Sequence, residues 1–154
     1  TFIDLMTARE IGIKERVFSF VLYGGLGVTT EVFFTAIVHL IDSGNVSDLS
    51  LKGHSYVWMF PIYGSTSVLF PIGFDLLKRM NRLIRYLIYG VGIMLVELAT
   101  GFMLEQLTGR CPWEYQTGWH FGGYIRFDYL PLWMLFGAMI EEFHRFNLSI
   151  GITK

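Results

Sequence analysis

The sequence predicts an all-α membrane protein with four transmembrane helices, and three observations lead to that fold class. The chain has 154 residues, of which 53% are hydrophobic and 17% aromatic. Only 16% of the residues are charged, whereas a soluble domain carries about 25%. Four apolar runs are each long enough to cross roughly 30 Å of hydrocarbon as a helix. These runs cover residues 17–41, 56–77, 83–108 and 127–150.

The composition excludes several classes of protein. High hydrophobicity with few charges excludes intrinsic disorder. The net charge of −1 offers no basic field, so we expect no nucleic-acid partner. The single cysteine, Cys111, cannot form an intrachain disulfide or a multi-cysteine metal site. The expected partners are membrane lipids together with further copies of the chain or a larger membrane complex.

The first element is a segment over residues 1–16, which is mixed in polarity and lies ahead of the first apolar run. It is typical of a helix lying along the membrane interface, but a frayed polar leader explains it equally well. The first span follows over 17–41, and Gly24, Gly25 and Gly27 in it permit close helix approach.

The second span, over residues 56–77, contains Pro61 and Pro71. Proline kinks a helix and leaves carbonyl groups without donors, which in a membrane need a buried or hydrated neighbour. The pattern therefore predicts a kinked second helix, either lining a cavity or simply packing against its neighbours. A tight basic turn over 78–82 leads into the third span, over 83–108.

An external loop rich in glycine and aromatic residues separates the third span from the fourth, over 127–150. Its rings are typical of an interfacial aromatic belt, or the loop folds back over the bundle as a cap. The nearby carboxylate of Glu114 is expected to raise the pKa of the Cys111 thiol, so we expect no nucleophile there. Residues 151–154 form a short tail. The candidate site residues of the loop are Cys111, Trp113, Glu114 and Tyr115.

The distribution of lysine and arginine predicts the orientation of the chain. With four spans, both termini and the basic turn share one side of the membrane, and nine cations lie on that side against three on the other. The positive-inside rule then places both termini in the cytoplasm. The nine are Arg9, Lys14, Arg16, Lys78, Arg79, Arg82, Arg85, Arg145 and Lys154, and the three are Lys52, Arg110 and Arg126.

Three acids inside the spans are the main candidates for a functional site. Glu31, Glu97 and Glu141 each lie about fourteen residues into a span, and each would cost on the order of 2.5–3.5 kcal/mol if ionised and unpaired. We therefore expect them to converge inside the bundle. His39 and Thr100 are their predicted polar partners.

We expect no lysine or arginine to pair with these acids in the middle of the membrane, because Arg85 is expected to extend to the cytoplasmic surface. Carboxyl groups with such surroundings indicate a proton, cation or polar-ligand path. The alternative is that protonated acids only hydrogen-bond neighbouring helices and fix their packing.

The spacing Glu141-x-x-His144 also occurs in di-iron helix bundles. Those bundles need two such pairs and this chain has one, so we expect no metal site. No cofactor can be identified.

A series of motifs occurs in the same order as in a known family. The chain resembles the transmembrane protein 229 family and its bacterial relatives, the CmpB-like proteins described as ABC-transporter type IV. The resemblance covers about residues 20–146 and implies a polytopic membrane protein. The motifs are Glu31-Val-Phe-Phe-Thr35, Tyr56-Val-Trp58 with Ile62-Tyr-Gly64, Arg85-Tyr-Leu-Ile-Tyr89, Glu97-Leu-Ala-Thr-Gly-Phe102, Cys111-Pro-Trp-Glu-Tyr115 and Pro131-Leu-Trp133, followed by Glu141.

Three functions follow from these observations. The first is a small transport or permeation component that uses the intramembrane carboxylates. The second is a non-catalytic accessory subunit of a larger membrane complex, indicated by the small size and the aromatic content. The third is a lipid-acting enzyme, which would need an acid and a base within reach of each other. We do not expect enzyme activity, since no nucleophile–base pair is evident.

Overall fold

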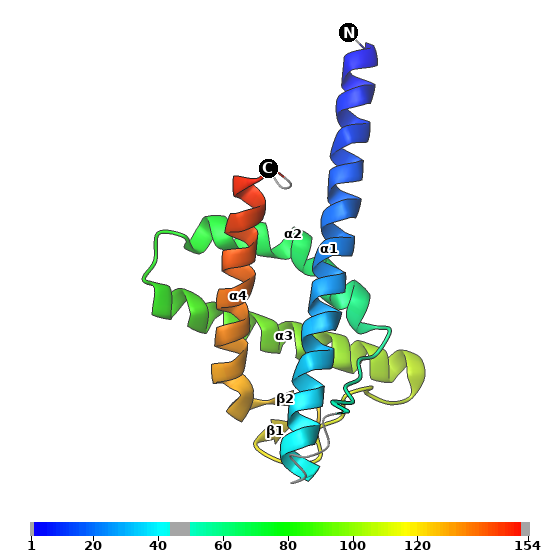
Figure 1. Ribbon diagram of the computed structural model, residues 1–154, viewed down its shortest axis with the longest axis vertical. Helices are drawn as coiled ribbons and strands as arrows, with labels where there is room; N and C mark the ends of the chain where they lie inside the picture. Colours follow the sequence, from blue (N-terminus) through cyan, green and yellow to red (C-terminus); the bar gives the residue numbers. More distant parts are fainter. Residues whose placement is uncertain (1, 44–49, 152–154) are drawn as a thin grey trace. The chain divides into compact units, whose positions relative to one another are not determined.

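The computed structural model of the protein describes the backbone of residues 2–43 and 50–151. Side chains are described for residues 12–41 and 50–151. The last three residues of the predicted tail, 152–154, lie outside the described residues. The chain is mostly helical, as predicted (Figure 1). Its elements are α1 (Phe2–Ser43), α2 (Met59–Leu77), α3 (Arg82–Thr108), β1 (His120–Phe121), β2 (Ile125–Arg126), the 3-10 helix η1 (Phe127–Tyr129) and α4 (Leu130–Ser149).

The chain forms two compact units, one up to Ile72 and the other over Gly73–Gly151. The first unit contains α1, the segment over 50–58 and most of α2. Helix α1 is continuous from Phe2, so residues 2–16 form its beginning, and their predicted place along the membrane interface stays a prediction. Its apolar part runs over Gly12–Ile41, which includes the whole of the predicted first span.

Small residues let α1 and α2 pack closely within the first unit. A Cβ atom on Gly24 would lie 2.9 Å from the carbonyl oxygen of Phe60, and one on Gly27 would lie 2.3 Å from Cγ of Tyr63. A Cβ on Gly64, in α2, would in turn lie 2.6 Å from the Phe20 ring. The glycines are therefore contact points where an aromatic side chain occupies the space of the missing Cβ, as the small-residue pattern predicted.

Helix α2 continues through Pro71 without a break in its assignment. Because proline has no N–H, the carbonyl of Ser67 lacks its usual donor four residues later. The hydroxyl of Ser67 donates to the Gly64 carbonyl at 2.7 Å. The structure does not show the predicted kink, which stays a prediction.

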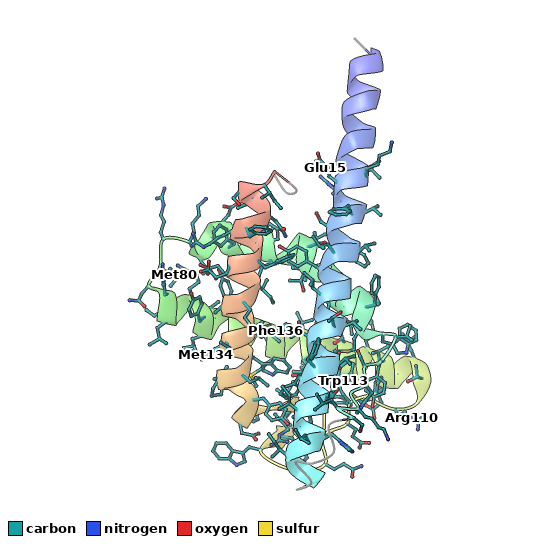
Figure 2. All side chains as sticks on the ribbon, in the orientation of Figure 1. Glu15, Met80, Arg110, Trp113, Met134 and Phe136 are labelled. Carbon is teal, nitrogen blue, oxygen red and sulfur yellow. The ribbon has the colours of Figure 1, made fainter. Side chains whose placement is uncertain are left out.

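The second unit is built around α3, whose two ends are well defined. The Asn81 side chain accepts a hydrogen bond from the Leu83 N–H at 2.9 Å, as an N-cap residue does. At the other end Gly109 adopts a left-handed conformation with φ of 83°, and its N–H donates to the Glu105 carbonyl at 2.8 Å. Figure 2 shows Met80 and Arg110 near the opposite ends of α3.

Helix α4 packs against α3, and the two helices cross in the view of Figure 1. A Cβ on Gly90 would lie 3.0 Å from Cγ of Met134, and one on Gly137 would lie 2.6 Å from Cβ of Tyr89. The two helices are antiparallel, because positions earlier in α3 contact positions later in α4. The N-terminal end of α3, which is predicted to be cytoplasmic, therefore lies beside the C-terminal half of α4.

Three helices of the described chain are long and apolar enough to cross a membrane: Gly12–Ile41 of α1, α2 and α3. Helix α4 has 20 residues, but its C-terminal half contains Glu141, Glu142 and Arg145. The structure therefore supports three of the four predicted spans by length and composition. Large apolar side chains such as Phe33 and Leu107 are 66% and 70% exposed, as suits a surface that faces lipid.

Candidate functional site

Glu31 lies in the first unit, where the segment after α1 folds back onto the helix. The Ser55 hydroxyl donates to Oε2 of Glu31 at 2.8 Å. One residue earlier, the His54 N–H donates to the hydroxyl of Thr35 at 2.9 Å. Gly53 lies so close to α1 that an added Cβ would be 1.9 Å from the Val32 carbonyl oxygen. The half-buried carboxyl group of Glu31 thus receives a neutral donor from outside its own helix.

Glu97 lies half-buried in α3 and is covered in a similar way by the loop that follows. The Tyr115 hydroxyl donates to Oε1 of Glu97 at 2.6 Å. Two turns further along α3, the Tyr124 hydroxyl makes a short hydrogen bond to Glu105. The Tyr115 N–H donates to the Gly123 carbonyl at 2.8 Å, which ties the two parts of the loop together. Two phenol groups therefore hold the loop over 109–126 on α3.

The loop packs tightly where α3 has a glycine. A Cβ on Gly101 would lie 3.2–3.3 Å from atoms of Tyr124, Cys111 and Trp113. The indole N–H of Trp113 donates to the Tyr124 carbonyl at 3.2 Å. The loop therefore packs on α3 within the second unit, and both the interfacial belt and the cap over the bundle stay predictions.

Cys111 is buried under the loop, and its thiol pKa is raised, as predicted. Burial is the main cause, because it disfavours the thiolate. The carboxylate of Glu114, which the sequence suggested as the cause, adds a smaller contribution along with those of Glu105 and Glu97. A raised pKa keeps the thiol protonated, and the thiol is a weaker nucleophile than the thiolate.

Glu141 corrects two of our expectations. Arg85 is buried, with 3% of its side chain exposed, and does not extend to the surface. Its Nε and Nη2 donate to the two carboxylate oxygens of Glu141 at 2.5 and 2.7 Å. Arg145, one turn further along α4, donates to Oε1 of Glu141 at 2.9 Å. The expectation that no cation meets this carboxylate is therefore wrong: the long side chain of Arg85 points toward α4, where it finds a counter-charge.

The Glu141-x-x-His144 pair is engaged in other contacts. Glu141 binds the two arginines, and the His144 ring packs edge-on against Phe74 with ring centroids 5.2 Å apart. In the described ranges, no three or more His, Cys, Asp or Glu side chains gather as metal ligands would.

The structure does not place the two acids of the second unit together. Glu141 lies at the level of Arg85, and Glu97 is twelve residues further along α3, about 18 Å at 1.5 Å per residue. The expected convergence of all three acids on one site is therefore not found for this pair. Their hydrogen-bond partners show that they belong to separate surroundings.

The structure also gives the acids other polar partners than His39 and Thr100, which the sequence predicted. His39 is exposed and lies eight residues, about 12 Å, along α1 from Glu31. The Thr100 hydroxyl donates to the Val96 carbonyl of its own helix at 2.6 Å. A hydroxyl inside a helix commonly bonds back to that helix, which explains why Ser55 and Tyr115, from connecting segments, are the donors instead.

Arg126 holds the end of the loop next to α4. Its guanidinium lies 4.1 Å from the centroid of the Tyr129 ring and 6.0 Å from that of Tyr115, and it forms an ion pair with Asp128. The hydrogen bond from Arg126 is the main reason why the pKa of Asp128 lies below its ordinary value of 3.8. Arg126 thus connects the base of α4 with the tyrosine that binds Glu97.

This ion pair predicts a pH dependence. A carboxyl group whose pKa is lowered on folding stabilises the fold above its ordinary pKa, and the contribution is lost as the pH falls through the lowered value. Asp128→Asn should therefore lower the melting temperature slightly at pH 7, and the difference from the unchanged protein should begin to shrink as the pH falls below about 3.8. Thermal unfolding of both proteins in detergent at a series of pH values measures it. A difference that stayed constant down to pH 3 would contradict the ion-pair explanation.

Comparison with known proteins yields one family. A model of the family described as “Putative ABC-transporter type IV” matches residues 18–152. The match includes Glu31, Glu97 and Glu141 and the loop over 109–126. No solved structure matches the chain.

Proposed function

Because the chain belongs to the family described as “Putative ABC-transporter type IV”, we propose that it is a small transport component in a membrane. In this proposal Glu31 and Glu97 are separate sites that bind and release a proton or a small cation. The segments over 50–58 and 109–126 cover these two sites.

The contrast between the acids is the observation that supports this function. Glu31 and Glu97 each receive a neutral hydroxyl from a segment outside the helix, at 2.8 and 2.6 Å. Glu141, by comparison, binds two guanidinium groups. A carboxylate paired with fixed cations stays ionised, whereas one that meets a hydroxyl can exchange a proton or bind a mobile cation.

The finer topology belongs to the same proposal. We place α4 across the membrane as a fourth span, since the pairing of Glu141 with Arg85 lowers the cost of burying its charge. Both termini then lie in the cytoplasm, following the nine cations of that side. A kink in α2 at Pro71 would give the path an irregular wall.

The test is ion flux through the purified protein in liposomes that contain a pH-sensitive dye. Unchanged protein should conduct protons or a monovalent cation down an imposed gradient. Glu97→Gln and Glu31→Gln should each reduce the rate at least about tenfold, because an amide cannot take up a proton or bind a cation electrostatically. Glu142→Gln is the matched control, since Glu142 is exposed on α4.

Normal flux in both glutamine variants would reject the carboxylate sites. A rate lowered equally by Glu142→Gln would show that the loss reflects a general defect. Circular dichroism of each variant confirms that the helices are intact.

The second candidate is an accessory subunit, and the exposed apolar surface favours it. Side chains such as Ile41 and Leu95 are 71% and 60% exposed, and either lipid or the helices of another subunit would cover them. Flux from the purified chain alone argues for transport. A complete absence of flux, restored only when a defined partner subunit is reconstituted with the chain, argues for the accessory role.

A further inference from the structure

The turn between α2 and α3 carries three cations, Lys78, Arg79 and Arg82. Four residues, 78–81, connect two helices that are each apolar enough to cross a membrane. A connection that short cannot leave the membrane surface. Lys78, Arg79 and Arg82 therefore lie at the level of the lipid headgroups.

The described side chains leave most of this positive charge without a neutralising carboxylate. Lys78 forms an ion pair with Asp75 at 2.7 Å. Arg79 and Arg82 are exposed, and within residues 12–41 and 50–151 no ion pair with a carboxylate is found for either. The two guanidinium groups are available to an external anion.

Exposed apolar side chains flank these cations at the end of α2, in the turn and at the start of α3. Leu76, Met80 and Leu83 are 76%, 40% and 67% exposed. Cations placed among exposed apolar groups match the membrane interface, where acyl chains lie directly below phosphate groups. An aqueous surface facing a soluble acidic protein would not favour these exposed leucines.

The backbone of the turn is fixed from inside the unit. Nη1 of Arg85 donates to the carbonyls of Met80 at 2.9 Å and Lys78 at 3.4 Å. Glu141 holds the same guanidinium through its other two nitrogen atoms. The buried ion pair thus satisfies the carbonyls of the turn and leaves Arg79 and Arg82 on its outer surface.

From these contacts we propose that the Lys78–Arg82 turn is a binding surface for the headgroups of anionic phospholipids. The two unpaired guanidinium groups attract the phosphate groups, and the exposed leucines enter the acyl region beside them. Each cation near an anionic surface contributes about a fivefold increase in association at low salt. The surface includes neither Glu31 nor Glu97, so the proposal holds for a transport component and for an accessory subunit alike.

The experiment measures lipid selectivity of the full chain in phosphatidylcholine membranes with spin-labelled lipids. Unchanged protein should prefer labelled phosphatidylglycerol over labelled phosphatidylcholine, and 1 M salt should weaken that preference. The Arg79→Gln/Arg82→Gln variant should lose most of it. Arg110→Gln is the matched control, because Arg110 is an exposed arginine near the other end of α3 (Figure 2).

A second variant separates lost charge from lost folding. Arg79→Lys/Arg82→Lys keeps both charges and should keep the preference for the anionic lipid. An unchanged preference in the glutamine variant, or an equal loss in Arg110→Gln, would overturn the proposal. Loss in the lysine variant would also overturn it, since that result indicates a partner that needs the planar guanidinium groups.

Discussion

Replacing Glu141 by glutamine should lower the free energy of unfolding by about 3–5 kcal/mol, the typical cost of leaving a buried charge without its partner. The reason is the environment of Arg85, which is 3% exposed and donates to both oxygens of Glu141. Glutamine is similar in size but has no charge and one acceptor oxygen. Arg145, whose side chain is 44% exposed, can turn to water, whereas Arg85 cannot. Chemical unfolding in detergent, followed by circular dichroism, measures the loss.

Two comparisons make this expectation specific. Glu142→Gln changes the next residue, which is exposed, and should alter stability by less than about 0.5 kcal/mol. The double variant Arg85→Met/Glu141→Leu should regain most of the lost stability, because apolar replacement of a buried ion pair is often neutral. If Glu141→Gln were as stable as the unchanged protein, the buried pair would not hold α3 and α4 together.

Gly27→Ala should destabilise the contact between α1 and α2 by about 1–3 kcal/mol, the usual cost of overpacking. The new Cβ would lie 2.3 and 2.5 Å from Cγ and Cβ of Tyr63. These atoms are at the base of the tyrosine side chain, so rotation of the ring does not remove the clash and the helices must move apart. Thermal unfolding in detergent measures the loss.

Gly25→Ala is the control for this substitution, since it lies two residues away in the same helix. A Cβ on Gly25 would meet nothing within 4 Å. Alanine forms helix more readily than glycine, by about 1 kcal/mol, so Gly25→Ala should leave stability unchanged or slightly higher. Equal effects of the two substitutions would contradict the close packing at Gly27.

Hydrophobic length predicted the helices well. The predicted spans over 56–77 and 83–108 correspond to α2 over Met59–Leu77 and α3 over Arg82–Thr108. The span predicted over 127–150 corresponds to a 3-10 turn followed by α4. Residues 2–16 are helical and continuous with the first span, because a helix continues wherever its backbone hydrogen bonds continue, whether or not the side chains are apolar; their place along the membrane interface stays a prediction.

The partners of the acids were harder to predict. The sequence contained one usable signal for Arg85: it lies in the first turn of α3, and Glu141 lies in the C-terminal half of α4, so antiparallel packing brings them to similar depth. The sequence offered no such signal for Ser55 or Tyr115, because both lie in connecting segments without periodicity.

By itself, the sequence determined where the apolar helices lie, which residues carry charge within them, and the family to which the chain belongs. Length and hydrophobicity suffice for the helices, and the order of the motifs suffices for the family, since all of these are properties of the chain itself. Only the tertiary structure decided that Glu141 is paired with Arg85 while Glu31 and Glu97 meet hydroxyl groups. Those pairings depend on which atoms of distant segments come within about 3 Å, and spacing along the chain does not specify that distance.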